Sequence, residues 1–151
     1  MPLSPSLSET ISAVRKDLAK VIEDLQSRPD YGKSQAAAVA TFESFDQELT
    51  TLQANSAPTA KDYATVQASA QDSVLPLVAR LINDNVAITK MMQLNTQRSI
   101  TPAMAKAHTA DLKTLQSDGK TLVAELAAEG GGATKVSAWP PQELTYGPKM
   151  T

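Results

Sequence analysis

Apolar residues recur every three or four positions along most of the chain, the spacing that places them on one face of a helix. The first stripe follows Ser6-Leu7-Ser8-Glu9, which has the pattern of a capping box, and ends before Pro29. A proline disfavours helical backbone at the residue before it, so we expect this helix to end near Arg28. The members of the stripe are Ile11, Val14, Leu18, Val21 and Leu25.

Three further stripes predict the rest of a bundle. A second helix is expected over about 34–52, and a third begins at the cap-like Thr59-Ala60-Lys61-Asp62. Pro76 predicts a break or kink near residues 73–75, since proline lacks the backbone donor, and the stripe then resumes over 77–92. Thr101-Pro102 begins the last helix. No segment alternates with the period of a strand, so the predicted fold is all-α, an up-and-down bundle of four to five helices.

Glycines 130–132 separate a segment with helical periodicity from a segment without it. Residues 6–129 are expected to form the helical bundle domain, and residues 130–151 a Gly-rich hinge and a Pro-containing, extended and irregular C-terminal tail. The tail holds Trp139, the one tryptophan of the chain. Three interpretations of it stay open: packing on the bundle, a lid over a cavity, or a docking motif for another protein.

Composition narrows the possible partners. A chain of 151 residues fits one domain, and 14 basic against 16 acidic side chains argue against a nucleic-acid partner. With no cysteine and one histidine, disulfides and Cys- or His-rich metal sites are not expected, and we expect no cofactor. No apolar run approaches the ~20 residues of a transmembrane segment. The start lacks the features of a secretory signal, which leaves an intracellular protein or a processed, mature form.

Sequence motifs for common reactions are missing. There is no nucleophile elbow and no Gly-x-x-x-x-Gly-Lys phosphate loop, and the triple glycine follows no predicted strand. The carboxylates of the first two helices are interpreted as solvated residues or salt-bridge partners on polar faces. They are Asp17, Glu23, Asp24, Glu43, Asp46 and Glu48.

Three residues on predicted apolar faces have two interpretations each. Gly119 either lets a neighbouring helix approach closely or leaves room for a ligand, because glycine costs about 1 kcal/mol in a helix. His108 is either a hydrogen-bonded core residue or a ligand-contacting, proton-transferring group. Asn85 either satisfies backbone near the proline break or anchors a ligand headgroup. Gln67 could reach the same space.

The order of these segments resembles a family, the fungal hydrophobic surface-binding protein A domain that is shared with cell-wall mannoproteins. The resemblance covers roughly residues 8–127 and rests on the segments Glu9–Val14, Leu49–Leu52, Ala60–Tyr63, Asp72–Val78 and Leu112–Leu115. It implies an all-helical bundle that binds hydrophobic surfaces or holds a lipid such as a fatty acid, without a cofactor. It also implies a secreted or cell-wall protein if the chain is a mature form; otherwise we expect a cytoplasmic one.

The first functional hypothesis is a carrier or sequestering protein that binds a hydrophobic small molecule or lipid between its helices. Alternatives are an enzyme acting on an apolar substrate with His108 as acid or base, and a helical interaction module that uses the Trp139 tail. A homo-oligomer is also possible. The residues expected to line the cavity are Phe42, Phe45, Tyr63, Val78, Leu81, Asn85, Ile88, Met92, Met104, His108, Leu112, Leu115 and Gly119.

Overall fold

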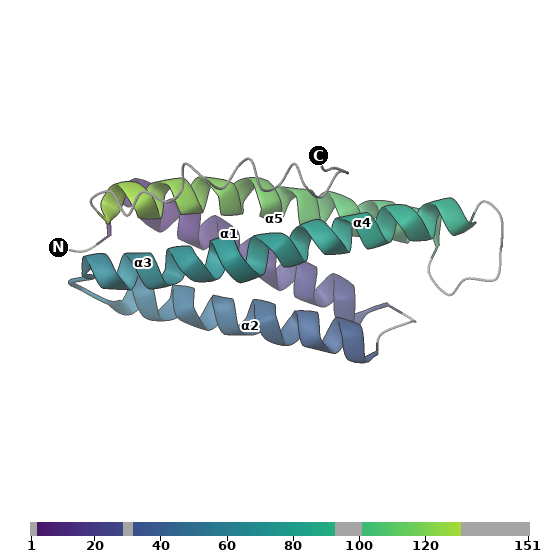
Figure 1. Ribbon diagram of the computed structural model, residues 1–151, viewed down its shortest axis with the longest axis horizontal. Coiled ribbons are helices and arrows are strands. Elements are labelled where there is room, and N and C mark those ends of the chain that lie inside the picture. The colour runs from purple at the N-terminus through teal and green to yellow at the C-terminus, as the bar shows by residue number, and fades with distance from the viewer. Residues whose placement is uncertain (1–2, 29–31, 93–100, 131–151) are drawn as a thin grey trace.

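A computed structural model describes residues 3–28, 32–92 and 101–130, apart from the side chains of Thr89, Met91 and Met92. The Trp139 tail, residues 131–151, and the side chain of Met92 therefore lie outside the described residues. Nearly all of the described chain is helical (Figure 1). The elements are α1 (Pro5–Gln26), α2 (Lys33–Ala54), α3 (Ala60–Ser69), the π-helical segment η1 (Ala70–Val74), α4 (Leu75–Met92) and α5 (Pro102–Glu129).

The helices form an all-α bundle, which confirms the predicted fold class. Because α3, η1 and α4 follow one another without interruption, the described residues make four rods (Figure 1). Successive rods pack against each other, and α5 closes the bundle by packing along α1 as well as along the α3–η1–α4 rod. The Ser6 hydroxyl donates a hydrogen bond to Glu125, so the start of α1 lies beside the end of α5 and the two run antiparallel. Among these described helices, none is both long enough and apolar enough to cross a membrane.

The helix starts follow the sequence signals, with one correction. Thr59 and Thr101 cap α3 and α5 as predicted: their hydroxyls accept hydrogen bonds from the backbone N–H of Asp62 and Met104, each at 3.1 Å. The predicted capping box of Ser6 is wrong, because Ser4 is the N-cap of α1 and accepts from the N–H of Leu7 at 3.2 Å. Pro5 explains the earlier start, since its fixed φ suits the first helical position.

The apolar stripes form the core. Every member of the α1 stripe and the corresponding residues of α2 are at most 4 % exposed. Phe42 and Phe45 are the largest of these side chains, and Phe42 is fully buried. Helix periodicity alone therefore identified the buried faces of α1 and α2. Val86 is an exception in the predicted stripe over 77–92 of α4, since it is 43 % exposed.

Pro76 perturbs the third rod without ending it. The N–H of Leu75 donates to the carbonyl of Ala70, five residues earlier, so the break predicted near residues 73–75 takes the form of the π segment Ala70–Val74. A π turn widens the helix by one residue, which accommodates the backbone carbonyls that a proline cannot bond. Beyond it, α4 runs past the N-terminal end of α2 (Figure 1). There Ile88 and Met104 pack around Ala105 in a small second cluster.

Candidate functional site

The residues expected to line one cavity are spread along the whole bundle. Tyr63 and Ile88 lie on the same rod, roughly 37 Å apart at a helical rise of about 1.5 Å per residue. Between them lie the central core residues, each at most 7 % exposed. These are Phe42, Phe45, Val78, Leu81, Leu112 and Leu115.

Gly119 follows the close-packing interpretation. A Cβ at this position would lie 3.0 Å from Cδ2 of Leu75, so the space opposite the glycine is already occupied by a side chain. Leu75 is itself 2 % exposed, which means that it has little freedom to move away. The glycine lets α5 approach the junction of η1 and α4.

Asn85 and His108 are brought together at the end of α1. The guanidinium of the buried Arg28 donates a hydrogen bond from Nη1 to Oδ1 of Asn85 at 2.9 Å. Nε2 of His108 lies 3.9 Å from Oδ1 of Asp24. The space that these four side chains share with Leu81 and Leu112 has a volume of about 10 Å³, which admits one water molecule at most.

A more open pocket of about 270 Å³ adjoins that space and shares Arg28, Asn85, Leu25 and Leu81 with it. Ile88 also lines this pocket, together with Ser34, Gln35, Asp84 and Ala87. It brings together three residues of the expected cavity, namely Leu81, Asn85 and Ile88. The others are not among its lining residues.

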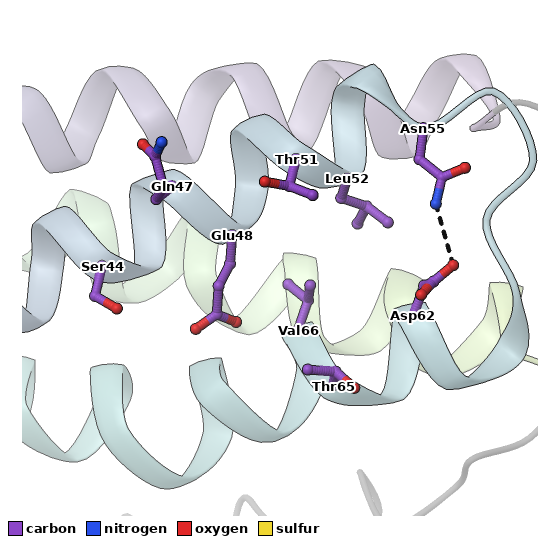
Figure 2. A pocket seen from close by; sticks show the side chains of 9 residues that line it. All are labelled: Ser44, Gln47, Glu48, Thr51, Leu52, Asn55, Asp62, Thr65 and Val66. Carbon is purple, nitrogen blue, oxygen red and sulfur yellow. Dashed lines mark hydrogen bonds between the residues drawn. The ribbon is translucent and has the colours of Figure 1, made fainter.

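A groove between α2 and the α3–η1–α4 rod offers more room. One part has a volume of about 360 Å³ and is lined by Ser44, Gln47, Glu48, Thr51, Leu52, Asn55, Asp62, Thr65 and Val66 (Figure 2). The adjoining part has about 300 Å³ and is lined by Ala40, Thr41, Ser44, Phe45, Glu48, Ser69, Ser73 and Val74. Ser44 and Glu48 belong to both parts, so the two adjoin.

Short side chains explain why this groove stays open. Seven of the fifteen lining residues are Ala, Ser or Thr, whose short side chains fill little of the space between two helices. Beneath them lie buried apolar residues such as Leu52 and Val66. At one end, the Asn55 side-chain amide donates to Asp62 at 3.1 Å and bridges the two helices (Figure 2).

Glu48 occupies the middle of the groove. Its side chain extends from α2 toward α3, in the same direction as that of Ser44 (Figure 2). Its Oε1 is shielded from solvent and has no hydrogen-bond partner among the described residues. The sequence interpretation of Glu48 as a solvated surface carboxylate is therefore wrong for this oxygen.

A larger depression between α1 and α2 has a different character. Its volume is about 720 Å³, but its lining is mostly charged or amide-bearing, and Ile22 is its one large apolar side chain. Arg15 crosses it, with Nε 2.9 Å from Oδ1 of Asp46 and Nη1 donating to Gln53 at 3.0 Å. The predicted salt-bridge role of Asp46 is thus confirmed, and this depression offers little apolar surface to a ligand.

Two carboxyl pairs lie in the contact between α1 and α5. Burial raises the pKa of Asp17 to about 7, helped by a hydrogen bond with the Asp118 carboxyl group and by its negative charge. Burial raises the pKa of Asp24 to about 7 as well, helped by a hydrogen bond with Asp111 and by its charge. Lys16 and Lys20 oppose these shifts weakly. The expectation that Asp17 and Asp24 are solvated or paired with cations is therefore corrected.

These pairs make the fold sensitive to pH. An unfolded chain releases the Asp protons near the ordinary pKa of 3.8, whereas the folded chain retains them up to about pH 7. At these two residues the folded state therefore binds more protons between these values, and their contribution to stability is full below about pH 4 and falls as the pH rises toward 7. No group of three or more His, Asp or Glu residues suited to a metal ion occurs in the described part of the chain.

In comparisons with known proteins, no family model, no curated protein and no solved structure matches this chain. The resemblance to the hydrophobic surface-binding family thus stays a prediction. The groove, the pockets and the carboxyl pairs are the features of this chain that bear on its function.

Proposed function

We propose that this protein binds a small molecule with an apolar chain, which it holds in the groove between α2 and the α3–η1–α4 rod. The observation that carries the proposal is that two open spaces, of about 360 and 300 Å³, adjoin at Ser44 and Glu48 between the same two rods. Pockets of a few hundred Å³ are the usual size for small-molecule sites. This keeps the hypothesis of an apolar ligand between helices and moves its site from the filled core to the groove.

The chemistry of the lining supports an amphipathic ligand. Buried apolar side chains form the floor, while hydroxyl groups, two amides and the carboxyl groups of Glu48 and Asp62 line the walls. An alkyl chain shielded from water by such walls gains about 0.8 kcal/mol for each buried CH₂ group, so a chain of moderate length binds without specific chemistry. The polar wall residues then orient the polar end of the ligand.

The π segment adds a second line of support. Ser73 and Val74 belong to η1, and both line the groove. Single π turns cost backbone energy and occur frequently at functional sites, where they shift the side chains that follow by one position. Here the π segment forms part of one groove wall.

The proposal is tested by titrating octan-1-ol into the isotopically labelled protein and following the backbone amide shifts by NMR. We expect saturable shifts in α2, α3 and η1. Ser44→Leu fills the point where the two spaces meet, so it should weaken binding at least tenfold. Ser117→Leu, at an exposed position of α5, is the matched control and should bind as the parent does.

Two outcomes would refute this location. The absence of saturable shifts would exclude an alkyl-chain site in the groove. Saturable shifts around Leu81 and Ile88, unaffected by Ser44→Leu, would instead assign binding to the pocket beside Arg28. Circular dichroism of both variants ensures that a loss of binding is not a loss of helix.

A further inference from the structure

Glu48 differs from the other polar residues that line the groove. It lines both of its parts, and its Oε1 is shielded from water without a hydrogen-bond partner in the described structure. Several wall hydroxyls are already engaged: the hydroxyl of Thr65, for example, donates to the carbonyl of Lys61 at 2.9 Å. A polar oxygen that loses water and gains no donor costs free energy on folding. Glu48 is only partly buried, so a small turn of its side chain brings this oxygen to the groove, where a donor on a ligand recovers that cost.

The groove contains no side chain that could neutralise this carboxyl group. Neither lining set includes a lysine, an arginine or a histidine. The second carboxyl group of the lining, that of Asp62, is already engaged by the backbone N–H of Thr59 at 2.8 Å and by Asn55 at 3.1 Å. Those hydrogen bonds lower the pKa of Asp62, with the backbone bond as the largest cause. Glu48 is therefore the lining carboxyl group that no hydrogen bond among the described residues engages, and it lies in the middle of the groove rather than at its end.

From these observations we infer that the groove selects amphiphiles whose polar end is an ammonium group, with Glu48 as the residue that accepts its N–H donors. The inference rests on the proposed groove function and adds the chemical class of the ligand. Hydrogen bonds between charged groups are about twice as strong as those between neutral groups, so an ammonium head should be preferred over a hydroxyl head. A carboxylate head would be repelled by Glu48 and would find no cation in the walls.

The experiment compares three ligands with the same alkyl chain: octylammonium, octan-1-ol and octanoate, titrated at pH 7 by NMR or calorimetry. An alkylammonium group titrates near pH 10, as a lysine side chain does, so it is charged under these conditions. We expect octylammonium to bind at least tenfold more tightly than octan-1-ol, and octanoate to bind most weakly. A charged hydrogen bond is worth a factor of this size.

Variants of α2 test the role of Glu48. Glu48→Gln preserves the shape and should weaken octylammonium binding at least tenfold, to the level of octan-1-ol, while octan-1-ol binding stays unchanged. Glu43→Gln is the matched control: it removes the same charge from the same helix at an exposed position in the depression that faces α1. This control separates a specific contact from general attraction of a cation to an acidic protein.

The possible failures are distinguishable. The inference would be overturned by equal affinities for the three ligands. It would also be overturned by a preference for ammonium that survives Glu48→Gln, or that is lost equally in Glu43→Gln. Each of these results would leave the groove as an apolar site. Lack of binding by all three ligands would overturn both the inference and the proposed function. Ammonium selectivity that disappears with Glu48→Gln alone would support both.

Discussion

Gly119→Ala tests the close approach of α5 to the junction of η1 and α4. Alanine in place of glycine within a helix contributes about 1 kcal/mol of stability through helix propensity. Against this, the new Cβ would lie 3.0 Å from Cδ2 of Leu75, well inside the 3.5–4.0 Å at which carbon atoms attract each other. Forcing an extra carbon into a packed core costs about 1–3 kcal/mol. We therefore expect Gly119→Ala to lower the free energy of unfolding by about 1 kcal/mol.

The same substitution should have the opposite effect once Leu75 is truncated. Leu75→Ala alone should cost about 2–5 kcal/mol, because it leaves a cavity beside α5. In that background the Cβ of alanine at position 119 meets no side-chain carbon at 3.0 Å, and the propensity gain of about 1 kcal/mol remains. The coupling energy between the two positions should thus be about 2 kcal/mol.

Urea unfolding followed by circular dichroism at 222 nm measures this coupling in four proteins: the parent, each single variant and the double variant. A stabilisation of about 1 kcal/mol by Gly119→Ala in both backgrounds would refute the reasoning, because it would mean that Leu75 does not occupy the space opposite the glycine. Binding of octan-1-ol should be unchanged in Gly119→Ala, since residue 119 does not line the groove.

Three further predictions concern the helix contacts and a helix end. The free energy of unfolding should decrease by about 1–2 kcal/mol between pH 4 and pH 7.5, after allowance for solvent screening of the partly accessible Asp17 and Asp24 pairs. Asp118→Asn should reduce this decrease in urea titrations without abolishing it, because the pair of Asp24 and Asp111 remains; a flat profile in the parent would contradict the prediction. Arg15→Ala should lower the free energy of unfolding by about 1 kcal/mol, because Arg15 loses its hydrogen bonds to Asp46 and Gln53 of α2. The effect should be smaller at high salt, since the contact with Asp46 is an ion pair. An unchanged urea midpoint would contradict this prediction. Thr101→Ala should cost about 1 kcal/mol by removing the cap of α5, whereas Thr101→Ser should retain most of the stability; equal losses in both variants would argue against a capping role.

The position of the carboxyl pairs was partly readable from the sequence. Asp17 and Asp24 are seven residues apart in α1, and Asp111 and Asp118 have the same spacing in α5. Each directly precedes a buried residue of its helix stripe, so all four lie at the edge of an apolar face. The spacing indicates that residues of one helix share a side, but it does not say which helix lies opposite. Only the antiparallel register of α1 and α5 showed that Asp17 lies beside Asp118 and Asp24 beside Asp111.

The groove could not be derived from periodicity. Hydrophobic spacing identifies the buried face of a helix, and here it did so for the stripes of α1 and α2, whereas Val86 in the stripe of α4 is exposed. It carries no information on the polar flanks, where Ser44, Glu48 and Thr65 lie. Whether short polar residues face water or face each other across a gap depends on the distance between two rods, and that distance is set by packing elsewhere in the bundle.

The sequence by itself determined the local structure of this protein: the helical segments, the caps at Thr59 and Thr101, the perturbation near Pro76 and the buried stripes. These features depend on interactions within a few residues, which the order of amino acids specifies directly. The tertiary structure alone decided that Leu75 occupies the space opposite Gly119 and that open volume lies between α2 and the α3–η1–α4 rod. Close packing explains this difference, because whether a space is filled depends on side chains that are distant in the chain.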